Sequence, residues 1–128
     1  MQSPRTLMFK LHPCIDGCNP LGEDPSKYGQ GTVRVDIKND AYTITVTVTG
    51  LTPDSRHLIN FHFGSCANVG LFPYDQITVA TADATGKFTS ATTRPGVYVV
   101  PGSGLVLTVH GDDRSRRETH LACADMTN

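Results

Sequence analysis

The sequence contains no tryptophan, and aromatic residues make up only 7% of its 128 residues. Charged residues are few, at 18%, and the formal net charge is -1. This balance argues against a nucleic acid or an anionic membrane as a partner, because both attract strongly basic proteins. No apolar run approaches the roughly 20 residues of a membrane-spanning helix, and the first residues lack the apolar core of a signal peptide. We therefore expect either a cytosolic protein or a secreted one whose leader is absent from this numbering.

A helical period of 3.6 residues is also missing, whereas a two-residue alternation of apolar and polar side chains recurs along the chain. The predicted strands, besides the one within 57–66, are 5–11, 32–38, 41–49, 76–81, 87–92, 96–100, 105–110 and 120–124. Residues 67–74 are predicted to form an irregular loop. The pattern predicts a single all-β domain, a β-sandwich or flattened barrel of about eight strands. Residues 1–30 would supply a strand and a cysteine-containing extension, and residues 31–128 the sandwich.

The hairpin predicted at 32–49 has one apolar face and one face of alternating threonines along its second strand. A threonine face is typical of a solvated β surface, with an assembly or ice-binding surface as the alternative.

The segment 57–66, HLINFHFGSC, holds the most informative residues. Side chains of a strand alternate between its two faces. The apolar face would carry Ile59, Phe61 and Phe63. Asn60 and His62 would lie side by side on the opposite face. Two histidines at this spacing on a rigid strand are a common way to hold a metal ion, so the presence of Asn60 at the first position is the central question.

Four cysteines in a small domain are compatible with two disulfides and an oxidising compartment. The arrangement of His12, Cys14 and Cys18 predicts a short disulfide-closed loop. A metal knuckle is the alternative, although no second pair of ligands follows it.

From about Gly31 onward the chain carries an ordered set of short motifs: Gly50-Leu51-Thr52-Pro53, His57, Asn60-Phe61-His62, Gly64, Cys66, Thr81-Ala82-Asp83 with Gly86, Val109-His110 with Asp112-Asp113, and Leu121-Ala122-Cys123. This ordered set resembles the copper/zinc superoxide dismutase family. The resemblance implies a Greek-key, immunoglobulin-like β-sandwich with a metal site on its outer face. It also implies a disulfide between Cys66 and Cys123, which leaves Cys14 and Cys18 to pair with each other or stay free.

The family's copper ligands carry over only in part. His62 matches the second histidine of the copper-binding pair, and His110 matches the later copper ligand. Asn60 stands in place of the first histidine, and an amide is a poorer copper ligand than imidazole. His57 matches a position that supports the site through hydrogen bonds.

Other parts of the family pattern are absent. The loop at 67–74 has no bridging histidine, and Asp75 is the one nearby carboxylate, so zinc at the family site is not expected. His120 stands where the family has an arginine that attracts superoxide, and Arg114, Arg116 and Arg117 are the candidates to replace part of that positive charge.

Three functions follow from this comparison. We expect a secreted superoxide-dismutase-like protein that is not an enzyme and serves as a structural, self-assembling or metal-binding module, with copper as the candidate ion. The alternatives are a copper-only dismutase with altered ligands and a copper carrier. His62, His110 and His120 could form a new three-histidine site with Asn60 as a weak fourth ligand, or the histidines could be remnants that make ordinary hydrogen bonds. The N-terminal segment 1–28 could also exchange between subunits of a homo-oligomer, the alternative being a loop held on its own domain.

Overall fold

The computed structural model describes residues 5–14, 29–95, 104–112 and 120–126, and all regular structure within them is β-strand. The strands are β1 (Arg5–Pro13), β2 (Gln30–Lys38), β3 (Ala41–Thr49), β4 (Arg56–Ser65), β5 (Asn68–Thr81), β6 (Phe88–Pro95), β7 (Leu105–Asp112) and β8 (His120–Asp125). No helix in this described part is long and apolar enough to cross a membrane.

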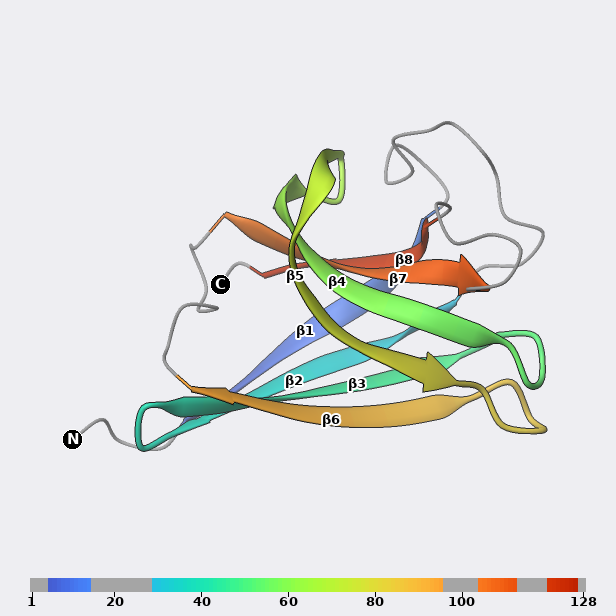
Figure 1. Cartoon of the computed structure of the whole chain (residues 1–128), viewed down its shortest axis with the longest axis horizontal. Helices are drawn as coiled ribbons and strands as arrows, with labels where there is room; N and C mark the ends of the chain where they lie inside the picture. The colour runs from blue at the N-terminus through green and yellow to red at the C-terminus, as the bar shows by residue number, and fades with distance from the viewer. Residues whose placement is uncertain (1–4, 15–28, 96–103, 113–119, 127–128) are drawn as a thin grey trace.

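The eight strands form one antiparallel sheet with the order β5-β4-β7-β8-β1-β2-β3-β6. The sheet curls into two facing layers, one made of β1, β2, β3 and β6 and the other of β4, β5, β7 and β8 (Figure 1). Because β6 pairs with β3 and β7 pairs with β4, the chain crosses between the layers in the manner of a Greek key. The predicted all-β sandwich or flattened barrel is confirmed.

Curling brings the two end strands of the sheet, β5 and β6, close together. Here a side chain links them: Nη2 of Arg94 in β6 donates hydrogen bonds to the carbonyl oxygens of Gln76 at 3.0 Å and Ile77 at 3.5 Å in β5. Arg94 thereby ties β6 to the backbone of β5, the strand at the other end of the sheet order.

Two-residue alternation places the core as predicted. The inward side chains of the hairpin β2–β3 are buried: Val33, Val35, Ile37, Tyr42, Ile44, Val46 and Val48. Asn39 and Asp40 both have positive φ values, 51° and 64°, as a tight hairpin turn requires. On the opposite face of β3, Thr43 and Thr47 hydrogen-bond to Thr93 and Thr89 of β6 through their hydroxyls, at 2.9 and 3.4 Å.

The prediction of an irregular loop at 67–74 is wrong, because residues 68–81 form one long strand. Gly70 and Pro73 suggested a loop, but β5 is an edge strand, and edge strands tolerate proline better than central strands do. Three register shifts between β4 and β5 absorb the irregular residues.

The predicted inward position of Phe63 is also wrong, since its side chain is 56% exposed. The register between β4 and β5 shifts between Phe61 and His62 and again between His62 and Gly64, and Gly64 has a φ of 116°, so the simple alternation ends there. The strand predicted at 96–100 and the segment 15–28 lie outside the described residues, as do Arg114, Arg116 and Arg117.

Candidate metal centre

Three neighbouring strands of one layer each contribute a histidine to a single cluster. His62 comes from β4, His110 from β7 and His120 from β8, and these strands are adjacent in the order β4-β7-β8. His110 and His120 lie opposite each other in the β7–β8 ladder, with a register shift beside them. The sheet topology therefore brings together residues that are up to 58 positions apart, from 62 to 120.

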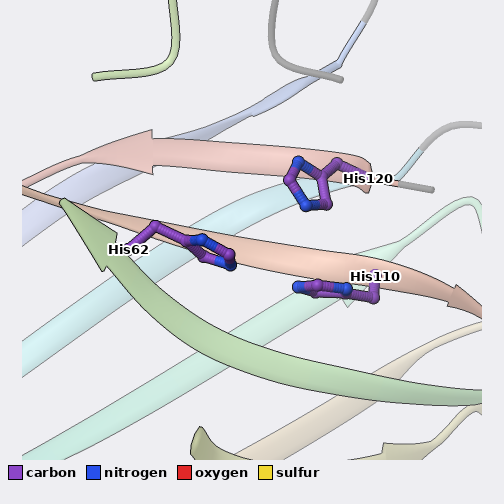
Figure 2. A group of neighbouring side chains, drawn as sticks. All are labelled: His62, His110 and His120. Atoms are coloured by element: carbon purple, nitrogen blue, oxygen red, sulfur yellow. The ribbon is translucent and has the colours of Figure 1, made fainter. Parts of the chain in front are cut away.

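The three imidazole rings converge in Figure 2. Their centroids are 5.7 Å apart for His62 and His110, 5.5 Å for His62 and His120, and 4.6 Å for His110 and His120. One nitrogen of each ring lies within 4.8 Å of the nitrogens of the other two. All three side chains are buried, with at most 5% of their surface exposed.

The cluster lies on the face of its layer that points away from the main core. Ile59 and Phe61 of β4 belong to that core, so the alternating Asn60 and His62 point to the other side. A smaller apolar cluster covers this second face: Cys14, Val69, Val106, Cys123 and the partly buried Cys66.

A hydrogen bond fixes the protonation pattern of the neutral His62 ring. Nδ1 of His62 lies 2.8 Å from the carbonyl oxygen of Gly70. Because a carbonyl can only accept, Nδ1 must carry the hydrogen, which leaves the lone pair on Nε2. Backbone carbonyls orient metal-binding histidines in this way in many proteins.

His110 is surrounded by polar side chains from its own strand and from β4. Its Nε2 lies 3.0 Å from Oγ1 of Thr108 and 3.4 Å from Nδ2 of Asn60. Asn60 is itself 3% exposed, and its Oδ1 is buried without a hydrogen-bond partner among the described residues. The amide that replaces the first histidine of the expected pair therefore adjoins the cluster directly.

His57, on the same strand as His62, makes a hydrogen bond to the backbone of His110. Its Nδ1 donates to the carbonyl oxygen of His110 at 2.8 Å, and its Nε2 lies 2.6 Å from Oγ of Ser55. The ring is 2% exposed and stacks on Phe88. His57 is thus bonded to the backbone of a candidate ligand, where it could position that residue.

The predicted disulfide between Cys66 and Cys123 is present and joins the β4–β5 hairpin to β8. The backbone N–H of Cys66 also donates to Oδ1 of Asp125 at 2.7 Å. Cys14 is disulfide-bonded as well, whereas Cys18 lies outside the described residues. The disulfide-bonded state of Cys14 argues against the alternative of a metal knuckle at this position, since a metal ligand must be a thiolate.

The donor geometry fits a metal ion that prefers imidazole. Two nitrogens bound to one tetrahedral ion, each about 2.0–2.1 Å from it, lie about 3.4 Å apart. The present limit of 4.8 Å requires the widest pair to close by at most about 1.4 Å. Three buried histidines can therefore hold a metal ion, and imidazole donors suit copper and zinc among others.

Sequence reasoning did not identify Thr108 and Gly70, which contact His110 and His62. Thr108 is two residues before His110 on the same face of β7, so the alternation of the strand was a usable signal. The contact from Gly70 depends on the extended β5, which the glycine and proline content concealed. Asp75, the carboxylate considered for zinc, lies in β5 opposite Phe61.

No protein-family model matches the chain, and no curated protein matches it either. The resemblance to copper/zinc superoxide dismutases stays a hypothesis that depends on the motifs quoted above.

Proposed function

We propose that this protein is a secreted superoxide-dismutase-like β-sandwich that binds one copper or zinc ion at His62, His110 and His120 and does not turn over superoxide. The observation that carries the proposal is the convergence of three buried imidazole nitrogens within 4.8 Å. Three rings from three strands, supported by the hydrogen bonds of Gly70 and His57, match the way proteins orient imidazole ligands.

The strand arrangement supports the family assignment within this proposal. His62 and His110, matched to copper ligands by sequence, lie on adjacent strands with their rings stacked at 5.7 Å. The cysteines matched to the family disulfide are bonded. Disulfides persist in oxidising compartments, so Cys14, Cys66 and Cys123 support a secreted protein.

The absence of turnover follows from two substitutions. Dismutation requires copper to alternate between two oxidation states in one geometry, and Asn60 replaces an imidazole that would help hold both. His120 replaces the arginine that attracts superoxide, and it is buried beside two other rings. A neutral imidazole does not raise the local concentration of an anion as a guanidinium does.

The proposal is tested by titrating the purified protein with Cu²⁺ and with Zn²⁺ in a calorimeter. We expect one ion per chain for the wild type and loss of tight binding in His110→Ala. His12→Ala is the matched control, because His12 is an exposed histidine of β1. Equal weak binding by the wild type and His110→Ala would overturn the proposed site.

A copper-only dismutase is the second candidate, and the third histidine favours it, since His120 supplies an imidazole in addition to the two matched ligands. The copper-loaded protein is assayed for superoxide removal against the same concentration of free copper. Activity well above that of free copper selects the dismutase, whereas tight binding without activity supports a binding or carrier role.

A further inference from the structure

We propose that Asn60 supplies the fourth donor of the centre through its amide oxygen and thereby favours the divalent ions Zn²⁺ and Cu²⁺ over Cu⁺. This inference rests on the proposed metal binding. It adds a residue that determines which ion, and which oxidation state of copper, the centre holds.

The position of Asn60 is the first argument. It lies on β4 two residues before His62, on the same face of the strand. Its side chain is buried, and Nδ2 lies 3.4 Å from Nε2 of His110. The amide therefore adjoins the ring of one of the three candidate ligands. The χ2 torsion of asparagine is broad and roughly two-fold, so a half-turn would bring the amide oxygen to the same place.

The buried carbonyl oxygen is the second, independent argument. Oδ1 of Asn60 has no hydrogen-bond partner in the described part of the chain. In its present orientation the oxygen therefore loses no hydrogen bond when the side chain makes that half-turn. After the turn, a cation held by the neighbouring imidazoles would give the oxygen a partner, since a carbonyl oxygen offers it a lone pair, whereas a buried oxygen without a partner costs about 1–3 kcal/mol.

The chemistry of the donor set gives the selectivity. Three imidazoles and one oxygen match the tetrahedral nitrogen and oxygen sites of Zn²⁺ and the nitrogen and oxygen sites of Cu²⁺. Cu⁺ is a soft ion that prefers thiolate and thioether sulfur, and a carbonyl oxygen adds little to its binding. Removing the oxygen should therefore weaken the binding of divalent ions and leave Cu⁺ affinity nearly unchanged.

The experiment measures affinities for Zn²⁺ and for Cu⁺ by competition with chromophoric chelators, with ascorbate as the reductant for copper. The variants are Asn60→Leu, which removes the oxygen at similar volume, and Asn60→Asp, which keeps an oxygen donor. We expect Asn60→Leu to bind Zn²⁺ about 10–100-fold more weakly and Cu⁺ as the wild type does. Asn60→Asp should bind Zn²⁺ at least as tightly as the wild type.

The inference is overturned if Asn60→Leu leaves the ratio of Zn²⁺ to Cu⁺ affinity unchanged, or if Asn60→Asp weakens Zn²⁺ binding as much as Asn60→Leu. Asn60→Ala gives the same comparison if leucine prevents folding, which circular dichroism reports. Loss of binding in His110→Ala with no effect in the Asn60 variants removes this inference alone. Wild-type binding by His110→Ala removes the proposed function with it.

Discussion

Nδ1 of His57 lies 2.8 Å from the backbone carbonyl oxygen of His110, and this hydrogen bond joins β4 to β7 where their ladder is irregular. The register between these strands shifts between His57 and Ile59, and the β7–β8 register shifts between Val109 and His110. The His57 ring thus bonds β7 at His110, which is one of the candidate ligands.

Replacing His57 should therefore lower metal affinity without touching a ligand. His57→Phe keeps a ring against Phe88 but loses the donor to His110, and we expect about a 10–100-fold loss of affinity for Zn²⁺ with a loss of about 1–3 kcal/mol in stability. His57→Asn is the matched variant, because its amide nitrogen can donate from a similar place. In chelator competition, His57→Phe should bind Zn²⁺ more weakly than the wild type, and His57→Asn should stay closer to the wild type. Wild-type affinity in His57→Phe would refute the positioning role.

The Cys66–Cys123 disulfide closes a loop with a sequence separation of 57 residues. On chain-entropy grounds, such a loop stabilises the fold by about 4 kcal/mol. We expect the double variant Cys66→Ala, Cys123→Ala to lose about this free energy of unfolding in urea denaturation. A loss below about 1 kcal/mol would show that the denatured chain is already constrained in this region.

The turn that contains Gly86 gives a prediction about backbone packing. Gly86 and Gly104 have nearly equal positive φ values, 78° and 77°. A Cβ added at Gly86 would overlap the carbonyl oxygen of Leu51, whereas a Cβ at Gly104 would meet nothing within 4 Å. Gly104→Ala should cost about 1–2 kcal/mol for the left-handed backbone alone. Gly86→Ala should cost about 1–3 kcal/mol more for the overlap. Equal losses in thermal unfolding would contradict this account.

Most of the fold could be predicted from the sequence because its strands have one buried face. The alternation over β2 and β3 fixes which residues point inward, and the Asn39–Asp40 turn fixes their register. β5 could not be predicted in full, since its bulges and its edge position let Gly70 and Pro73 enter a strand. Local propensity does not contain the information that a strand is at an edge.

The residues of the candidate site could be proposed from the sequence, but their arrangement in space could not. The resemblance identified His62, His110 and His57, and the departure at His120 raised the idea of a third ligand. Whether the His120 ring turns toward the other two depends on the shift between Val109 and His110, which two-residue alternation does not predict. The supporting contacts of Thr108 and Gly70 likewise depend on how β4, β5 and β7 pair.

The turn at 82–86 gives a prediction about pH. Oδ1 of Asp83 accepts hydrogen bonds from Oγ1 of Thr85 at 2.6 Å, from the N–H of Thr85 at 2.8 Å and from the N–H of Lys87 at 3.2 Å. These bonds, the Thr85 hydroxyl first, hold the pKa of the Asp83 carboxyl below its ordinary value of 3.8.

Because the folded pKa of Asp83 is depressed, the unfolded chain binds the proton more readily. Asp83 therefore contributes stability that is present above pH 3.8 and is lost as the pH falls through the folded pKa. We expect the free energy of unfolding to fall less steeply below pH 4 in Asp83→Asn than in the wild type. We also expect Thr85→Val, which removes the strongest bond at similar volume, to raise the Asp83 pKa in an NMR titration of the carboxyl carbon. An Asp83 midpoint at or above 3.8 in the wild type would mean that the turn does not bind the ionised carboxylate preferentially.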